Sequence, residues 1–184
     1  MLVPGQVGSV DRPRGVEQGK RLDDDQQGPI KRSRDEILHD LAQFPIEFKR
    51  VIIDPNNRAA LLRPAFDGGW GIVEILPHLK DWEKIYFERA SKILSEEEPH
   101  LTSFDDTLWS IERDYRGQDP YEALADFSEL RRQLVELLTN ARPSEWQRTA
   151  MHGYYGQITL HWMADHICDH DEEHFQQARD ALAG

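Results

Sequence analysis

Hydrophobic residues recur at spacings of three and four in four long stretches of the chain, and this period constrains the fold more than any other feature. A helix places such positions on one face, so each stretch predicts an amphipathic helix with one buried side. The first stretch, which includes Ile37 and Leu41, follows residues 33–36, a Ser-Arg-Asp-Glu capping box. Pro45 predicts a kink in this helix, and the Pro-Asn-Asn of residues 55–57 predicts its end.

Two further helices are delimited by similar signals. The second is predicted to begin after the Asp-Gly-Gly of residues 67–69 and to end at the Ser-Glu-Glu-Glu-Pro of residues 95–99. Asp119 is a predicted N-cap with Pro120 at the first helical position, and this third helix should end near Asn140.

The last long helix is predicted from about Thr159 to Leu182, with short helical segments at residues 103–115 and 144–147. No run of alternating hydrophobic and polar residues bounded by turns is found, so no β-sheet is expected. Four long amphipathic helices joined by connections of mixed length predict an all-α four-helix bundle.

Residues 1–31 differ in composition from the rest of the chain. Glycines, prolines and an acidic run at residues 23–25 dominate, and the few hydrophobic residues show no period. Such a segment cannot bury enough surface to offset its chain entropy. We expect a flexible N-terminal tail, disordered or extended, over residues 1–31 and a bundle domain over residues 32–184. A docking arm or a translated upstream extension are alternative interpretations of the tail.

The net charge, the hydropathy and the cysteine count limit the kinds of partner and the cell compartment that are expected for the chain. The formal net charge is −12, from 22 basic and 34 acidic residues, and such a surface repels phosphate backbones and anionic lipids. No apolar run approaches the roughly 18 residues of a membrane span, and the N-terminus lacks the apolar core of a secretory signal. The single cysteine, Cys168, excludes an internal disulfide. We therefore expect a cytoplasmic protein that binds neither nucleic acid nor membranes.

Three histidines follow one another at intervals of four in the last predicted helix. At about 100° per residue, His174 falls within the apolar face, His170 at its edge and His166 at the boundary with solvent. Two imidazoles one turn apart can share a metal ion at about 2.0–2.1 Å from each nitrogen. The alternative is that these histidines are merely exposed or hydrogen-bonded, which is common on helices.

A third candidate ligand is His78, on the flank of the apolar stripe of the second helix. Burying two polar rings of the last helix without partners would cost on the order of 1–3 kcal/mol each, so a further partner is expected. A flank position can face a neighbouring helix, although His78 can equally be a surface histidine. A metalloprotease is excluded, because the HExxH motif requires Glu after its first histidine and Asp171 stands there.

Two segments are similar to the DinB-like superfamily. One is Gly-Trp-Gly at residues 69–71, followed by the His-Leu-Lys-Asp-Trp-Glu of residues 78–83. The other is Tyr-Gly-Gln-Ile-Thr-Leu at residues 155–160, followed by His-Asp-Glu-Glu-His-Phe-Gln-Gln at residues 170–177. The resemblance covers roughly residues 33–180, which leaves only the tail outside it.

This resemblance implies an up-down-down-up four-helix bundle that often forms a homodimer. It also implies a divalent metal bound by a histidine triad, here His78, His170 and His174. His166 has no counterpart in that triad and is a reserve candidate. Pro77 departs from the pattern and is expected to bend the second helix at the site.

Three neutral imidazoles would leave one or more coordination positions of the ion open, as catalytic sites do. Zinc or nickel would suit these ligands, and iron or manganese are alternatives. The ion could acidify a water for hydrolysis of a small molecule, or hold a low-molecular-weight thiol for transfer, as the resemblance implies. In a non-enzymatic alternative, the ion only staples the second helix to the last.

Several other side chains are candidate contributors. Those that could orient a ligating ring or assist the reaction are Asp81, Glu74, Asp171 and Arg148. Aromatic residues that could line a pocket over the ion are Tyr154, Tyr155, Trp82 and Trp109. All of them can equally be surface charges or plain core, and Cys168 is not expected to act as a nucleophile.

Overall fold

The computed structural model of the chain describes residues 28–54, 61, 70–106 and 108–183. The predicted tail up to residue 27, the helix-ending residues 55–57 and the helix-starting residues 67–69 therefore lie outside the described residues. Within the described part, none of the helices combines the length and the apolar character that crossing a bilayer requires.

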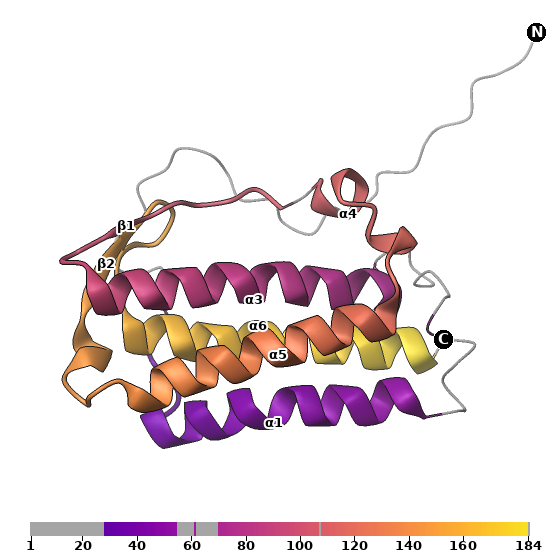
Figure 1. The fold of residues 1–184 in the computed structure, drawn as a ribbon, viewed down its shortest axis with the longest axis horizontal. Coiled ribbons are helices and arrows are strands. Elements are labelled where there is room, and N and C mark those ends of the chain that lie inside the picture. Colours follow the sequence, from indigo (N-terminus) through magenta and orange to yellow (C-terminus); the bar gives the residue numbers. More distant parts are fainter. Residues whose placement is uncertain (1–27, 55–60, 62–69, 107, 184) are drawn as a thin grey trace, which may run out of the picture.

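Four long helices form the body of the molecule: α1 (Arg34–Ile53), α3 (Ile72–Ser95), α5 (Pro120–Asn140) and α6 (Leu160–Ala183). In Figure 1, α1 and α6 run in one direction and α3 and α5 in the opposite one. Both α3 and α1 pack against α5 and α6. The predicted up-down-down-up four-helix bundle is confirmed.

The capping residues begin the helices where the sequence places them. Ser33 caps α1, and its backbone N–H donates to Glu36 Oε2 at 2.7 Å while its hydroxyl accepts from the Glu36 N–H. Asp119 Oδ1 accepts from the backbone N–H groups of the first turn of α5 at 2.8 and 3.1 Å. The helices α1 and α3 continue through Pro45 and Pro77, respectively.

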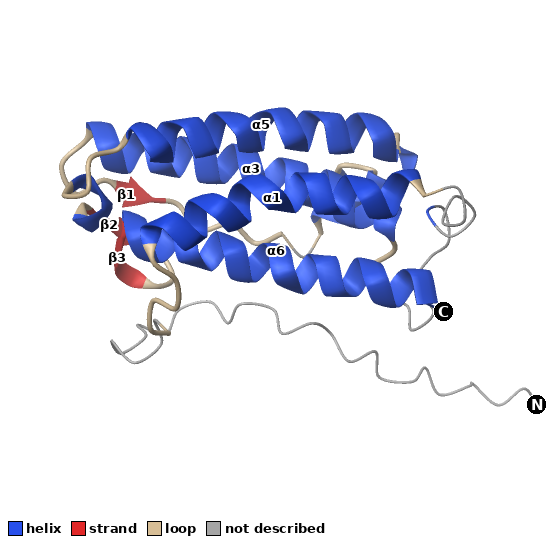
Figure 2. Ribbon diagram, turned by 90° about the horizontal axis from the view of Figure 1, so that it is seen from below, coloured by secondary structure: helices blue, strands red, loops and turns tan. Residues whose placement is uncertain are grey.

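The expectation that the chain has no sheet is wrong. Strands β1 (His100–Leu101), β2 (Thr149–His152) and β3 (Gly156–Thr159) form a small sheet in which β2 pairs parallel with β1 and antiparallel with β3. Figure 2 shows the strands together at one end of the bundle. Strands of two to four residues are too short to display the alternation by which a strand is found in a sequence. The hairpin ends directly at α6 and thereby fixes where that helix begins.

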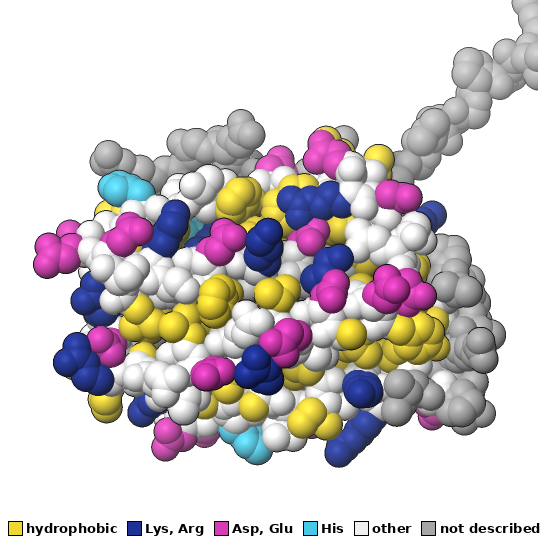
Figure 3. All heavy atoms as spheres, in the orientation of Figure 1, with side chains coloured by type: hydrophobic (Ala, Val, Ile, Leu, Met, Phe, Trp, Pro, Cys, Tyr) yellow, Lys and Arg dark blue, Asp and Glu magenta, His cyan; other side chains and the backbone are white. Residues whose placement is uncertain are grey.

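The shorter helical segments are smaller than predicted. Within residues 103–115 only α4 (Trp109–Glu112) is α-helical, and a 3₁₀ turn at Tyr115–Gly117 follows it. The predicted turn at residues 144–147 is a 3₁₀ turn at Glu145–Gln147. Figure 3 shows acidic and basic side chains interspersed over the face on which α1, α3 and α5 lie, as in an ordinary solvated surface.

A buried arginine joins the helices inside the core. The Arg131 guanidinium on α5 donates to both carboxylate oxygens of Glu83 on α3, each at 2.8 Å. It also donates to both oxygens of Asp171 on α6, at 2.6 and 3.0 Å, and to the Leu41 carbonyl of α1. All three charged side chains are at most 5% exposed. Because one guanidinium satisfies acceptors from three other helices, it fixes their relative rotation and height.

We predict that Arg131→Met destabilises the fold by about 3–5 kcal/mol, because two buried carboxylates lose the cation that pairs with them in the described part of the chain. Arg132→Met is the matched control, since Arg132 is 61% exposed and its ion pairs among the described residues are with exposed glutamates of its own helix. Urea denaturation of both variants measures the difference. Equal, small losses of stability in the two variants would show that the buried network is not needed for stability.

Candidate metal centre

The structure brings together His78 of α3 with His170 and His174 of α6. One ring nitrogen of each lies within 4.8 Å of the corresponding nitrogens of the other two. The ring centroid of His174 is 4.6 Å from that of His78 and 4.4 Å from that of His170. Nitrogens bound to one ion at about 2.0–2.1 Å must lie within roughly twice that distance of one another, so little adjustment is needed.

A hydrogen bond to Gln177 orients the His174 ring toward His170. His174 Nδ1 lies 2.9 Å from the amide oxygen of Gln177, an acceptor, so the ring proton sits on Nδ1. His174 Nε2 is then left with a lone pair, and it faces His170 Nε2 at 3.1 Å. An outer hydrogen bond of this kind fixes the tautomer and the ring plane of a metal ligand.

His78 contributes an unsatisfied polar atom. Its Nδ1 is buried and has no hydrogen-bond partner in the part of the chain that the structure describes. Asp106 Oδ2 is 3.9 Å away and already accepts from the indole N–H of Trp82 at 2.8 Å. A buried, unpaired ring nitrogen costs about 1–3 kcal/mol, so the His78 ring suits a place beside a ligand.

Burial sets the charge of the three rings. It is the largest cause lowering the pKa of each, and in His78 and His170 the neighbouring His174 lowers the pKa further. The imidazoles are therefore neutral at pH 7. The neutral form carries the lone pair that a metal requires, so the electrostatics and the geometry agree.

Aromatic rings surround the triad. The Trp70 indole lies parallel to the His174 ring and edge-on to His78, with centroids 6.3 and 4.6 Å away. Trp82 and Tyr86 flank His170 at 6.1 and 5.8 Å. Of the predicted pocket aromatics only Trp82 reaches the triad directly. The spacing 78, 82, 86 along α3 was a signal for Tyr86 that the sequence interpretation did not use.

The four charged helpers suggested by the sequence are engaged elsewhere. Asp171 pairs with Arg131. Asp81 accepts from Arg113 and Tyr115. The remaining two serve the backbone or the surface, Glu74 capping the start of α3 and pairing with Arg116, and Arg148 donating to the carbonyls of Ile93 and Glu96. None of them hydrogen-bonds to a triad ring within the described contacts, and Gln177 takes the orienting role.

His166, the reserve candidate, is not part of the cluster. Its ring stacks on Trp162 at 5.0 Å and meets Tyr155 at 5.5 Å. Cys168 is buried, its Sγ lies 3.6 Å from the Ala164 carbonyl, and burial raises the pKa of its thiol to about 12. Both residues therefore lie outside the chemistry of the triad.

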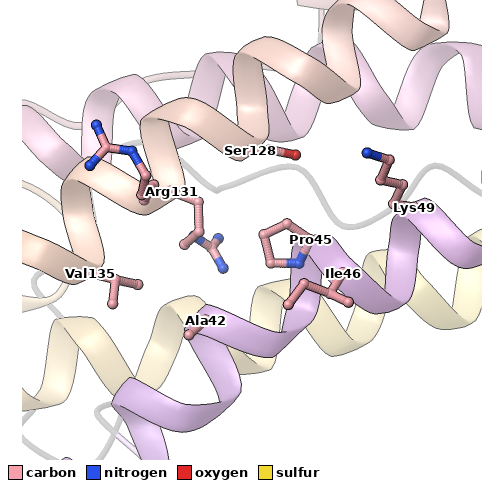
Figure 4. Close-up of a pocket in the computed structure, with 8 residues that line it drawn as sticks. Ala42, Pro45, Ile46, Lys49, Ser128, Arg131 and Val135 are labelled. Atoms are coloured by element: carbon pink, nitrogen blue, oxygen red, sulfur yellow. The ribbon is translucent and has the colours of Figure 1, made fainter.

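A pocket of about 220 Å³ adjoins the triad, with His170 in its wall. It extends between α3 and α6 toward the small sheet, where Tyr154 and Tyr155 line it. A larger cavity of about 340 Å³ lies between α1 and α5 (Figure 4), where Pro45, Ile46 and Val135 form its apolar part. The described residues that line that cavity include no histidine or carboxylate, so chemistry and not size identifies the candidate site.

Comparison with known proteins gives the same family. A model described as the DinB superfamily matches residues 50–178, most of the bundle. The chain belongs to the DinB superfamily. YfiT of Bacillus subtilis, provisionally named a metal-dependent hydrolase, is 27% identical over 122 residues, covering 66% of this chain and 68% of YfiT. A protein of Oceanobacillus iheyensis with the same provisional activity name is 27% identical over 126 residues, 68% of this chain and 72% of that protein.

The solved structure of YfiT supports the fold. It superposes with a TM-score of 0.74 at 24% sequence identity and covers 84% of this chain and 90% of that one. YfiT is described as a four-helix bundle of unusual topology.

We predict that the Cys168 thiol is protected in the folded chain. A thiol whose pKa is about 12 holds little thiolate at pH 8, so alkylation by iodoacetamide should be at least 100-fold slower than in guanidinium. The cysteine is the only one in the chain, so mass spectrometry reads the reaction without ambiguity. Fast modification of the native protein would contradict the buried position.

Proposed function

We propose that the protein is a divalent-metal-dependent hydrolase that acts on a small molecule, with His78, His170 and His174 as the metal ligands. The observation that carries the proposal is the convergence of three neutral ring nitrogens within 4.8 Å. Zinc or nickel suits three imidazoles best, with iron or manganese as alternatives. The provisional activity names of the relatives from Bacillus and Oceanobacillus support the same reaction class.

The donor set fits such an ion. Three neutral rings leave its double charge uncompensated, and three protein ligands leave coordination positions open. A divalent ion supplies Lewis acidity, which activates water and polarises a carbonyl or phosphoryl oxygen. Two further residues support the proposed ion site. Gln177 fixes the orientation of the His174 ring, and the Trp70 indole lies parallel to that ring.

The pocket favours an enzyme over a purely structural metal. A metal that only staples α3 to α6 needs no cavity, whereas His170 forms part of the wall of a 220 Å³ pocket. A small organic molecule can enter such a pocket and reach the ion. Transfer to a low-molecular-weight thiol, which the sequence resemblance implies, is the second reaction class to assay.

We predict that one equivalent of zinc or nickel stabilises the chain and that His174→Ala abolishes the response. Metal at 100 times its Kd adds about 2.7 kcal/mol, which raises Tm by roughly 5 °C or more for a chain of this size. Thermal shift and elemental analysis, on protein purified without a polyhistidine tag and stripped with chelator, measure the effect. His166→Ala is the matched control and should keep the full shift.

An unchanged metal response in His174→Ala would remove this residue from the ligand set. The reaction class is tested separately, with uncharged and charged carboxylic and phosphoric esters assayed before and after chelation and after metal is restored. Metal-dependent turnover of an ester supports the hydrolase. Turnover that appears only with added glutathione, bacillithiol or mycothiol would reassign the protein as a thiol transferase.

A further inference from the structure

The pocket contains hydrogen-bond donors that the proposed reaction does not use. Arg89 of α3 and His152 of β2 lie in its wall, on the side toward the small sheet. The triad lies at the other end of the pocket, where His170 forms part of the wall. The pocket wall runs from His170 to Arg89 and His152, and the small sheet lies at the end of the bundle where α3 ends and α6 begins (Figure 1).

Arg89 is a nearly buried cation with no carboxylate beside it. Its side chain is 8% exposed, and no acidic group of the described chain lies within ion-pair distance of it. One of its terminal nitrogens donates to the Thr102 carbonyl at 2.7 Å. Its guanidinium lies 5.5 Å from the Trp82 ring and 5.9 Å from Phe104. Burial lowers its pKa, which marks the position as costly for a cation.

His152 offers a second, fixed donor. Its Nδ1 accepts from the backbone N–H groups of Tyr154 at 3.1 Å and of Tyr155 at 3.2 Å. The proton of the neutral ring is therefore on Nε2, for which the described chain provides no hydrogen-bond acceptor. Burial lowers the pKa of His152 to about 4, so the ring is neutral at pH 7 and acts as an N–H donor without adding charge.

The remaining wall of the pocket is mainly flat and aromatic. Trp82, Phe104, Tyr155 and Trp162 contribute rings to it. Trp82 lies near both ends of the pocket. The centre of its ring is 6.1 Å from that of the His170 ring and 5.5 Å from the Arg89 guanidinium. Among the described residues of the wall, the carboxylate is that of Asp106, which accepts from the Trp82 indole, lies on the side of His78 and does not pair with Arg89.

We propose that the pocket selects a small aromatic carboxylate, whose carboxylate accepts from Arg89 and His152 while its ring packs against Trp82. One cation and one neutral donor match a single negative charge better than a dianionic phosphate. The substituent at the other end of the ring would then face the triad. The inference deepens the proposed function by naming the substrate class, but the binding of the carboxylate does not depend on the metal.

The test is a titration of the metal-loaded and the metal-stripped chain with benzoate and with benzamide, its uncharged analogue, followed by calorimetry and tryptophan fluorescence. We expect benzoate to bind at least 10-fold more tightly than benzamide in both forms. Arg89→Met should remove this preference, and Arg89→Lys should restore part of it. Arg113→Met is the matched control, because Arg113 also lies over an indole, that of Trp109 at 3.7 Å, but outside the pocket wall.

Each outcome decides a separate point. Equal affinity for benzoate and benzamide overturns the inference, as does tighter binding of phenyl phosphate than of benzoate. A benzoate affinity that Arg89→Met leaves unchanged places the carboxylate elsewhere, the ion included, and also overturns it. A cooperative thermal unfolding transition of Arg89→Met, measured without added metal, verifies that the variant folds. If the native chain shows no metal response but keeps Arg89-dependent binding of benzoate, the hydrolase proposal fails and this inference stands.

A second readout links the two sites. With 4-acetoxybenzoate, water adds at the acetyl carbonyl carbon, the bond from that carbon to the phenolic oxygen breaks, and acetate, 4-hydroxybenzoate and one proton are released. We expect kcat/KM at least 10-fold above that of its methyl ester, which lacks the negative charge. Arg89→Met should lower kcat/KM for the acid alone, whereas a merely structural role for Arg89 would lower both rates together.

Discussion

The ion network around Arg131 is the constraint on which the rest of the bundle depends. The Arg131 guanidinium donates to both carboxylate oxygens of Glu83 and to both of Asp171. A shift of α3 or α6 along its axis would break these hydrogen bonds, so the register of both helices is fixed. Asp171 directly follows His170, and Glu83 lies five residues after His78. The same contact that fixes the two helices therefore fixes the heights at which the histidines of α3 and α6 meet.

The site combines two environments within a short distance. At the triad, neutral rings and a buried, unsatisfied nitrogen of His78 favour a cation. Toward the sheet, Arg89 and the Nε2–H of His152 favour an anion. Aromatic rings lie between the two, and Trp82 is near both His170 and Arg89. Such a division would orient a molecule that carries a negative charge at one end and a reactive group at the other.

Much of the fold could be predicted from the sequence, because helix period and capping are local signals. Ser33 and Asp119 cap their helices as predicted. The i, i+4 spacing pointed to His170 and His174, and the family resemblance added His78. The three side chains lie close together in the structure, and their role as metal ligands stays a prediction. The small sheet could not be found, because its strands pair across long separations in sequence and are only two to four residues long.

The residues around the site were harder to predict from the sequence, for a related reason. Asp171 looks like a helper of the adjacent histidines, and only the position of Arg131 on another helix shows that it belongs to the core. Arg89 and His152 likewise carry no local motif. Their common placement depends on how α3 meets the hairpin, which no window of sequence contains.

The helix α3 also sets the distance between the histidine triad and Arg89. His78 and Arg89 are separated by 11 residues in sequence, which places them about 20° apart around the helix axis and about 16 Å apart along it. The length of the molecule that fits between these two residues is therefore set by a helix, which is rigid, and not by a loop. Relatives that keep the histidine but carry a cation one turn earlier or later on this helix would accept shorter or longer molecules with the same chemistry at the ion.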